Sequence, residues 1–111
     1  MTAVEGPTWH LVRGVAVPEG ATISARFVGG TVSGHAGVNR YRAEYTLDGD
    51  ALRIGPAAST RMAGAPDRMA AERDVLTLLD RVRSARVGSD GGSLELLDDD
   101  GEVLLGFEAS A

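Results

Sequence analysis

Short runs of alternating apolar and polar residues, each ended by a turn-forming sequence, constrain this chain more than any other feature. Residues 21–28 and 41–47 both alternate in this way, and the sequences Gly29-Gly30 and Asp48-Gly49-Asp50 follow them. Successive side chains of a strand point to opposite faces, so strict alternation predicts half-buried strands. Gly- and Asp-rich turns between such runs predict hairpins, and consecutive hairpins predict an antiparallel sheet.

One segment, residues 66–83, has helical spacing instead. Pro66 suits a first helical turn, and the expected buried stripe consists of Met69, Val75, Leu76, Leu79 and Val82. Further strands are expected near residues 9–12, 31–33, 51–54, 84–88, 94–97 and 103–108, with a short extended piece at 59–62. The predicted fold class is α+β, mainly β: an antiparallel, barrel-like curved sheet of about seven to nine short strands with one amphipathic helix over about 66–83.

Composition narrows the classes of protein to consider. With 111 residues the chain is expected to form a single domain over 1–111. A net charge of −5 argues against nucleic acid as a partner. The sequence has no cysteine and no apolar run near the ~20 residues of a membrane span. It shows no signal peptide or lipobox, so we expect a cytoplasmic protein as written, or an exported one if a signal has been removed.

Several segments occur in an order that resembles a known family. They are Trp9-x-Leu11, Ala25-x-Phe27, Val32-Ser-Gly34-x-x-Gly37-x-Asn39-x-Tyr41, Leu52-x-Ile54-Gly55, Thr60-Arg61-Met62-Ala63, Glu72 and Leu94-x-Leu96. Together they resemble the META domain of the HslJ-like heat-shock proteins, a DUF306-type family. The resemblance implies a small antiparallel sheet with one helix, and a loose association with heat shock, stress and antibiotic tolerance in bacteria. It implies no established reaction.

Two positions depart from the family pattern together. The family typically has cysteine where this chain has Val38 and Gly64. If the two cysteines are partners in relatives exposed to an oxidising envelope, a cytosolic member would lose both. The hypothesis predicts that the Cα atoms of Val38 and Gly64 lie within about 7 Å of each other.

The residues shared with the family have structural interpretations. Glu72 falls on or beside the buried stripe, where a carboxylate needs partners. Arg61 and Asn39 are the expected partners, and an Arg61–Glu72 ion pair would join the helix to the sheet. Asn39, Gly34 and Gly37 are expected to form a turn, with Asn39 tolerating left-handed geometry or bonding nearby backbone. A Glu72 tuned for acid–base chemistry is the weaker alternative.

No catalytic, metal-binding or cofactor-binding residues are predicted. His10 and His35 lack metal-ligand spacing, and no nucleophile motif accompanies His35. Asp98-Asp99-Asp100 lacks the spacing of an EF-hand, so a solvated hairpin turn is favoured over weak calcium binding. A hydrolase that uses His35 with a carboxylate is therefore the last of the hypotheses.

The leading hypothesis is a non-enzymatic META-type domain that acts by binding or interaction. The partner is expected to be a protein or a small apolar ligand, and the chain a monomer or a weak homo-oligomer. The alternative is a small β-barrel module whose apolar-ligand pocket is lined by Trp9, Phe27, Tyr41 and Tyr45.

Overall fold

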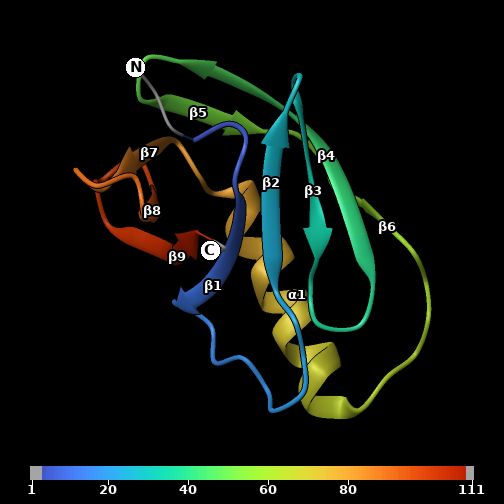
Figure 1. Cartoon of the computed structure of the whole chain (residues 1–111). Helices are drawn as coiled ribbons and strands as arrows, with labels where there is room; N and C mark the ends of the chain where they lie inside the picture. Colours follow the sequence, from blue (N-terminus) through green and yellow to red (C-terminus); the bar gives the residue numbers. More distant parts are fainter. Residues whose placement is uncertain (1–3, 110–111) are drawn as a thin grey trace.

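Nine strands and one helix make up the computed structural model, which describes residues 4–109 (Figure 1). The strands are β1 (Thr8–Arg13), β2 (Ser24–Val28), β3 (Thr31–His35), β4 (Arg40–Asp48), β5 (Ala51–Ile54), β6 (Ala58–Ser59), β7 (Ser84–Val87), β8 (Ser93–Leu97) and β9 (Val103–Ala109). The helix α1 spans Pro66–Asp80. The α+β, mainly β fold class predicted from the sequence is confirmed.

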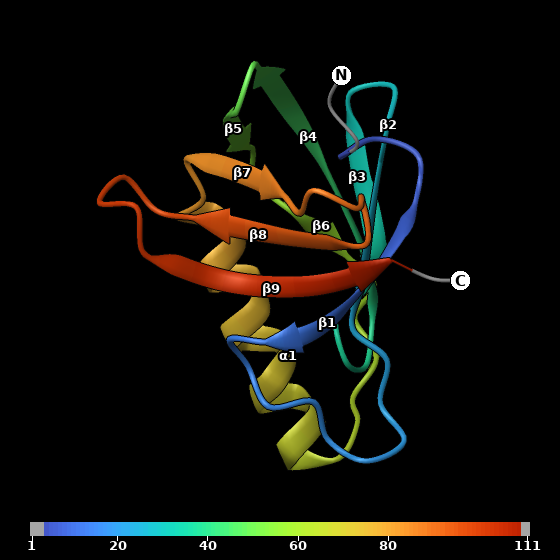
Figure 2. The same cartoon turned by 60° about the vertical axis from the view of Figure 1, so that its left-hand side comes forward.

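All strand pairings between the named strands are antiparallel, and eight strands form a ring-like curved sheet. The order is β3-β2-β1-β9-β8-β7-β5-β4-β6, and an additional pairing of β3 with β4 closes the ring. Figure 2 shows β7, β8, β9 and β1 side by side in this order. β6 pairs with β4 through Tyr41 and Arg42, on the edge that also pairs with β5. The shortest strand pairing in the ring is that of β5 with β7, which has a single residue pair, Ala51 with Ser84.

The inward positions of the strands form one apolar core. Trp9, Phe27, Leu94, Leu96 and Leu105 are fully buried within it. Alternation along β4 follows the sequence pattern, with outward residues exposed and inward ones buried. This arrangement explains why the alternating runs were a reliable guide: each curved strand has one apolar face inside and one solvated face outside.

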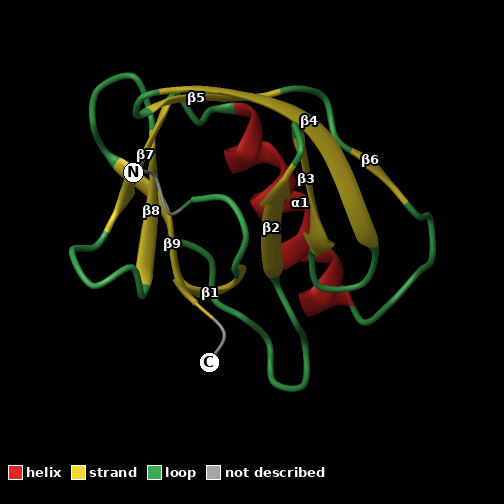
Figure 3. Cartoon of the chain, turned by 45° about the horizontal axis from the view of Figure 1, so that its top comes forward, coloured by secondary structure: helices red, strands yellow, loops and turns green. Residues whose placement is uncertain are grey.

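Helix α1 runs across the space that the strands surround (Figure 3). Ala71, Glu72, Val75 and Leu79 are its buried residues, and the three apolar ones belong to the same core as the sheet. The helix ends three residues earlier than expected, at Asp80, and Val82 is buried just beyond it. This helix is too short and too polar to cross a membrane, and it is the only one within residues 4–109.

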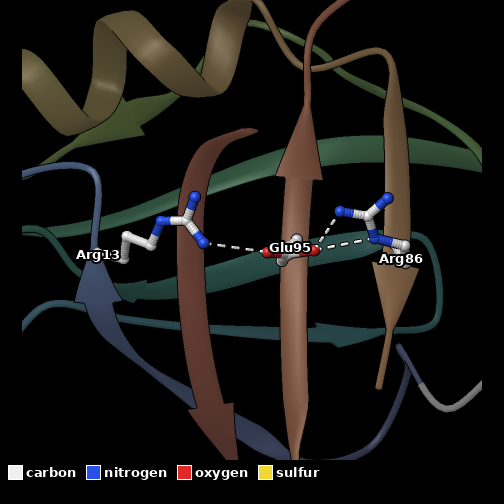
Figure 4. A network of polar contacts seen from close by, with 3 residues as sticks. All are labelled: Arg13, Arg86 and Glu95. Atoms are coloured by element: carbon white, nitrogen blue, oxygen red, sulfur yellow. Dashed lines mark hydrogen bonds and ion pairs between the residues drawn. The ribbon is translucent and has the colours of Figure 1, made fainter. Parts of the chain in front are cut away.

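On the outer face, one carboxylate connects three strands (Figure 4). Glu95 on β8 accepts a hydrogen bond from Arg13 of β1 at 3.2 Å and two from Arg86 of β7 at 2.8 and 2.5 Å. Gly106 of β9 lies between Arg13 and Glu95 in the register, and its missing side chain leaves room for Arg13 to cross β9. Both arginines are largely exposed, so this network adds only modestly to stability.

Candidate functional site

Some of the family-like residues come together beside α1: Gly37, Asn39, Thr60, Met62 and Glu72. Turn 36–39, between β3 and β4, lies against the helix there, and the extended segment 60–64 lies beside both. A Cβ atom on Gly37 would be 2.9 Å from the carbonyl oxygen of Arg68, so only glycine lets the turn approach the helix this closely. Gly37 also has a φ of +120°, which side chains rarely tolerate.

Glu72 is the buried carboxylate of this site. Its Oε1 accepts the backbone N–H groups of Val38 at 3.1 Å and Asn39 at 2.6 Å, while its Oε2 accepts the side-chain amide of Asn39 at 2.8 Å. The residue is 7 % exposed. Three N–H donors replace the water that burial removes, and hydrogen bonds to a charged acceptor are stronger than neutral ones. Glu72 therefore fixes the turn to the helix.

Asn39 continues the connection to the neighbouring segment. Its Nδ2 also donates to the carbonyl oxygen of Met62 at 3.1 Å, and its Oδ1 accepts from the Thr60 hydroxyl and the Met62 N–H, both at 2.8 Å. Both amide hydrogens and both oxygen lone pairs of the side chain are used. Helix, turn and segment 60–62 are thus joined by two side chains, Glu72 and Asn39.

This geometry corrects three expectations. The Arg61–Glu72 ion pair is wrong: Arg61 is exposed, and the ion pairs among residues 4–109 do not include it. Asn39 does not have a positive φ, so its role lies in side-chain hydrogen bonds and not in left-handed geometry. Met69 is 38 % exposed and lines a surface groove, so it lies outside the buried stripe.

The expectation that Gly34 forms part of the turn is wrong: Gly34 lies within β3 and belongs to a second contact, between β2 and β3. Any side chain there would collide with the carbonyl oxygen of Ser24. That oxygen accepts the Tyr41 hydroxyl at 2.8 Å, and the Ser24 hydroxyl accepts the His35 N–H at 3.1 Å. Burial raises the pKa of Tyr41 well above its usual range. Gly34 and Tyr41 therefore have packing roles.

The four aromatic residues proposed as a ligand pocket contact one another, the backbone and the Glu5 side chain. Phe27 and Tyr45 pack edge to face, with ring centroids 5.1 Å apart. The indole N–H of Trp9 donates to the carbonyl oxygen of Val4 at 2.9 Å, and the hydroxyl of Tyr45 bonds the Glu5 carboxylate. Burial and the Glu5 hydrogen bond raise the pKa of Tyr45. Trp9 and Phe27 are fully buried.

His35 and the acidic run lie away from this site. His35 is exposed on β3, and among residues 4–109 its imidazole ring takes part in no hydrogen bond or ion pair. The carboxylates of Asp98, Asp99 and Asp100 lie within 4.8 Å of one another. Asp98 accepts the backbone N–H groups of Asp100 and Glu102, both at 2.9 Å, and pairs with Arg81 at 3.6 Å. Its oxygens therefore cap a hairpin turn.

A groove of about 330 Å³ opens beside the Glu72–Asn39 pair. Its lining residues are Asn39, Ser59, Thr60, Arg61, Met62, Ala63, Met69 and Glu72. Met62 is 61 % exposed, although methionine is usually buried. The exposure of Met62 and Met69 was not predicted from the sequence. For Met62 a signal exists, because it stands between Arg61 and a small residue, outside any alternating run.

Comparisons with known proteins agree on the fold. The family model described as "META domain" matches residues 2–111. A protein from Burkholderia xenovorans, solved by NMR, is 26 % identical with a TM-score of 0.76, covering 97 % of this chain and 84 % of that one. A DUF4847 family protein from Bacteroides vulgatus is 12 % identical with a TM-score of 0.69, covering 95 % and 93 %. No curated protein matches the sequence.

The Val38–Gly64 expectation is confirmed by geometry. A Cβ atom on Gly64 would lie 3.4 Å from the Cβ of Val38, at the short end of the spacing in disulfides. Each Cα is one covalent bond from its Cβ, so the two Cα atoms must lie within the ~7 Å limit for a bridge. The pair therefore occupies positions that two cysteines could link without moving the backbone far.

We expect Glu72→Gln to destabilise the fold by about 2 kcal/mol, because the amide presents one acceptor oxygen and places an N–H group against N–H donors. Thermal and urea unfolding measure the loss. The matched control is Asp74→Asn, the same charge change on an exposed position of α1, which should change stability by less than about 0.5 kcal/mol. Equal effects of the two variants would contradict the structural role of Glu72.

The double variant Val38→Cys/Gly64→Cys should form a disulfide on oxidation. By the chain-entropy relation, a loop of this length adds about 3.5 kcal/mol of stability over the reduced form. Thiol titration and unfolding with and without reductant test this. A pair that stays reduced under oxidising conditions, or a bridge that lowers the melting temperature, would show that the two positions do not have bridging geometry.

Proposed function

The chain belongs to the META domain family, and we propose that it acts as a non-enzymatic binding domain that presents one surface to a partner protein. This surface, here the Met62 surface, consists of Arg61, Met62, Ala63 and Met69. The family association with stress and antibiotic tolerance is part of the proposal. In this proposal, the partner protein contacts those residues of the family-like segments that are exposed to solvent.

The observation that carries the proposal is the contrast between backbone and side chain in segment 60–63. Asn39 bonds both the N–H and the carbonyl oxygen of Met62, so its backbone is fixed. The side chains of Arg61 and Met62 are nevertheless exposed, and Met69 stands across the groove. A rigid backbone lowers the entropy lost on binding, and methionine adapts to apolar partners.

Other functions have less support. The His35 ring has no carboxylate partner among the described residues, which leaves the hydrolase hypothesis without a base–orienter pair. The barrel-ligand alternative needs space between Trp9, Phe27, Tyr41 and Tyr45, whose rings and polar groups contact protein instead. Binding through the outside of the fold is the function that the geometry supports best.

The test replaces both methionines with serine in the source bacterium. Met62→Ser/Met69→Ser should leave the melting temperature within a few degrees of the unchanged protein, because both side chains are exposed. It should reduce survival under heat or antibiotic stress to the level of a deletion strain. A photoreactive residue at position 62 should cross-link to a partner in the same cells, whereas one at position 28 should not.

The control is Val12→Ser/Val28→Ser, which removes two exposed apolar side chains from β1 and β2. This variant should support normal survival. Full survival with the methionine double variant would contradict the proposal, and so would equal losses with both double variants, because they would show only a general need for surface hydrophobicity.

A further inference from the structure

A second groove, on the other side of β6, has a different character. It runs along the outer face of β4 and has a volume of about 580 Å³, within the range of ligand sites. Thr31 and Ser33 of β3 line one side, residues 58–60 line the other, and residues 40–42 form the floor. We call it the Arg40–Arg42 groove. In Figure 1 these strands form the face on the right of the molecule.

The two arginines of this groove are not neutralised by the protein. Arg40 and Arg42 point outward from β4 and are exposed. Among the described residues, neither guanidinium takes part in a hydrogen bond or an ion pair. By contrast, Arg13 and Arg86 share a carboxylate. In a chain with a net charge of −5, two unpaired arginines at alternate positions are a local excess of positive charge, and the nearest carboxylate on this face of β4 is Glu44, which does not line the groove.

The rest of the lining favours an anion as well. No carboxylate lines the groove, and the hydroxyls of Thr31 and Ser33 face it from β3. Ser33 stands directly opposite Arg42 in the register, and on its other side it faces Arg26 of β2. The Arg26 Nε donates to the Gly6 carbonyl oxygen at 3.3 Å, which leaves its Nη groups available. Hydroxyl donors and guanidinium groups together are typical of carboxylate recognition.

We propose that the Arg40–Arg42 groove binds an extended acidic peptide segment with carboxylates at alternate positions. Arg40 and Arg42 are two residues apart on one face of a strand, a separation of about 6.8 Å. Alternate side chains of an extended peptide have the same spacing, so two carboxylates can face both arginines at once. A groove of this volume is much larger than a single phosphate requires.

The backbone of β4 cannot take part in this recognition. It is already paired with β3 on one edge and with β6 on the other, through Tyr41 and Arg42. Specificity must therefore come from side chains. The inference is independent of the Met62 surface, because Met62 and Met69 do not line this groove and each surface can be altered without the other.

The experiment is an NMR titration of the whole chain at low salt with a blocked peptide of sequence Gly-Ser-Asp-Ser-Asp-Ser-Gly. Shifts are expected at the amides of Ser33, Arg40, Arg42 and Ser59. An isomer with adjacent aspartates should bind about threefold more weakly, because neighbouring side chains of an extended peptide point to opposite sides. Arg42→Ser should weaken binding by about three- to fivefold, the range of an exposed ion pair.

The matched control is Arg53→Ser, an equal charge change at an exposed arginine of β5 that does not line the groove. It should weaken binding clearly less than Arg42→Ser, because it removes the same charge from outside the groove. Equal weakening by both arginine variants, shifts outside the groove or no binding would overturn the proposal. Inorganic phosphate that produces the same shifts and displaces the peptide at equal concentration would also overturn it, in favour of a phosphate site.

Discussion

The carboxylate of Glu72 is the interaction on which this end of the fold depends. It lies on the buried side of the helix and accepts hydrogen bonds from two backbone N–H groups of the turn that connects β3 to β4. A buried carboxylate without donors would be costly, and a turn with unpaired N–H groups would be costly too. Each satisfies the other, and Asn39 extends the arrangement to segment 60–62. Sheet, helix and connecting segment are therefore positioned relative to one another by two buried polar side chains.

In this arrangement, the residues that fix the backbone are different from the residues that are exposed to solvent. Asn39 and Glu72 direct their polar atoms inward and leave little for a ligand. The segment they hold directs Arg61 and Met62 outward, and residues 59 and 60 form the ridge between two grooves of unlike character. One groove is flanked by exposed methionines and the other by unpaired arginines. Because both lie on fixed backbone, the surface around β6 is pre-organised for binding in a way that exposed loops are not.

The strands were predictable because each has one buried face. Alternation located β4 and β5 nearly to the residue, and the helical stripe of Val75 and Leu79 located α1. The partners of Glu72 were only half predictable. A search among side chains finds Asn39 and Arg61, whereas two of the three hydrogen bonds come from backbone N–H groups that no side-chain pattern reveals. The exposure of Met69 could not be predicted for a related reason. Helical spacing places a residue on a face of the helix, but it does not show which other segments of the chain cover that face.

Amide hydrogen exchange of the native chain tests the central claim most directly. The N–H groups of Val38, Asn39 and Met62 lie in a turn and an extended segment, where exchange is ordinarily fast. If Glu72 and Asn39 fix these segments, all three amides should exchange only through large-scale opening, with protection close to that of core amides such as Leu96. Exchange as rapid as that of the exposed turn at Asp99 would show that the hydrogen bonds open independently of the fold, and would contradict the account.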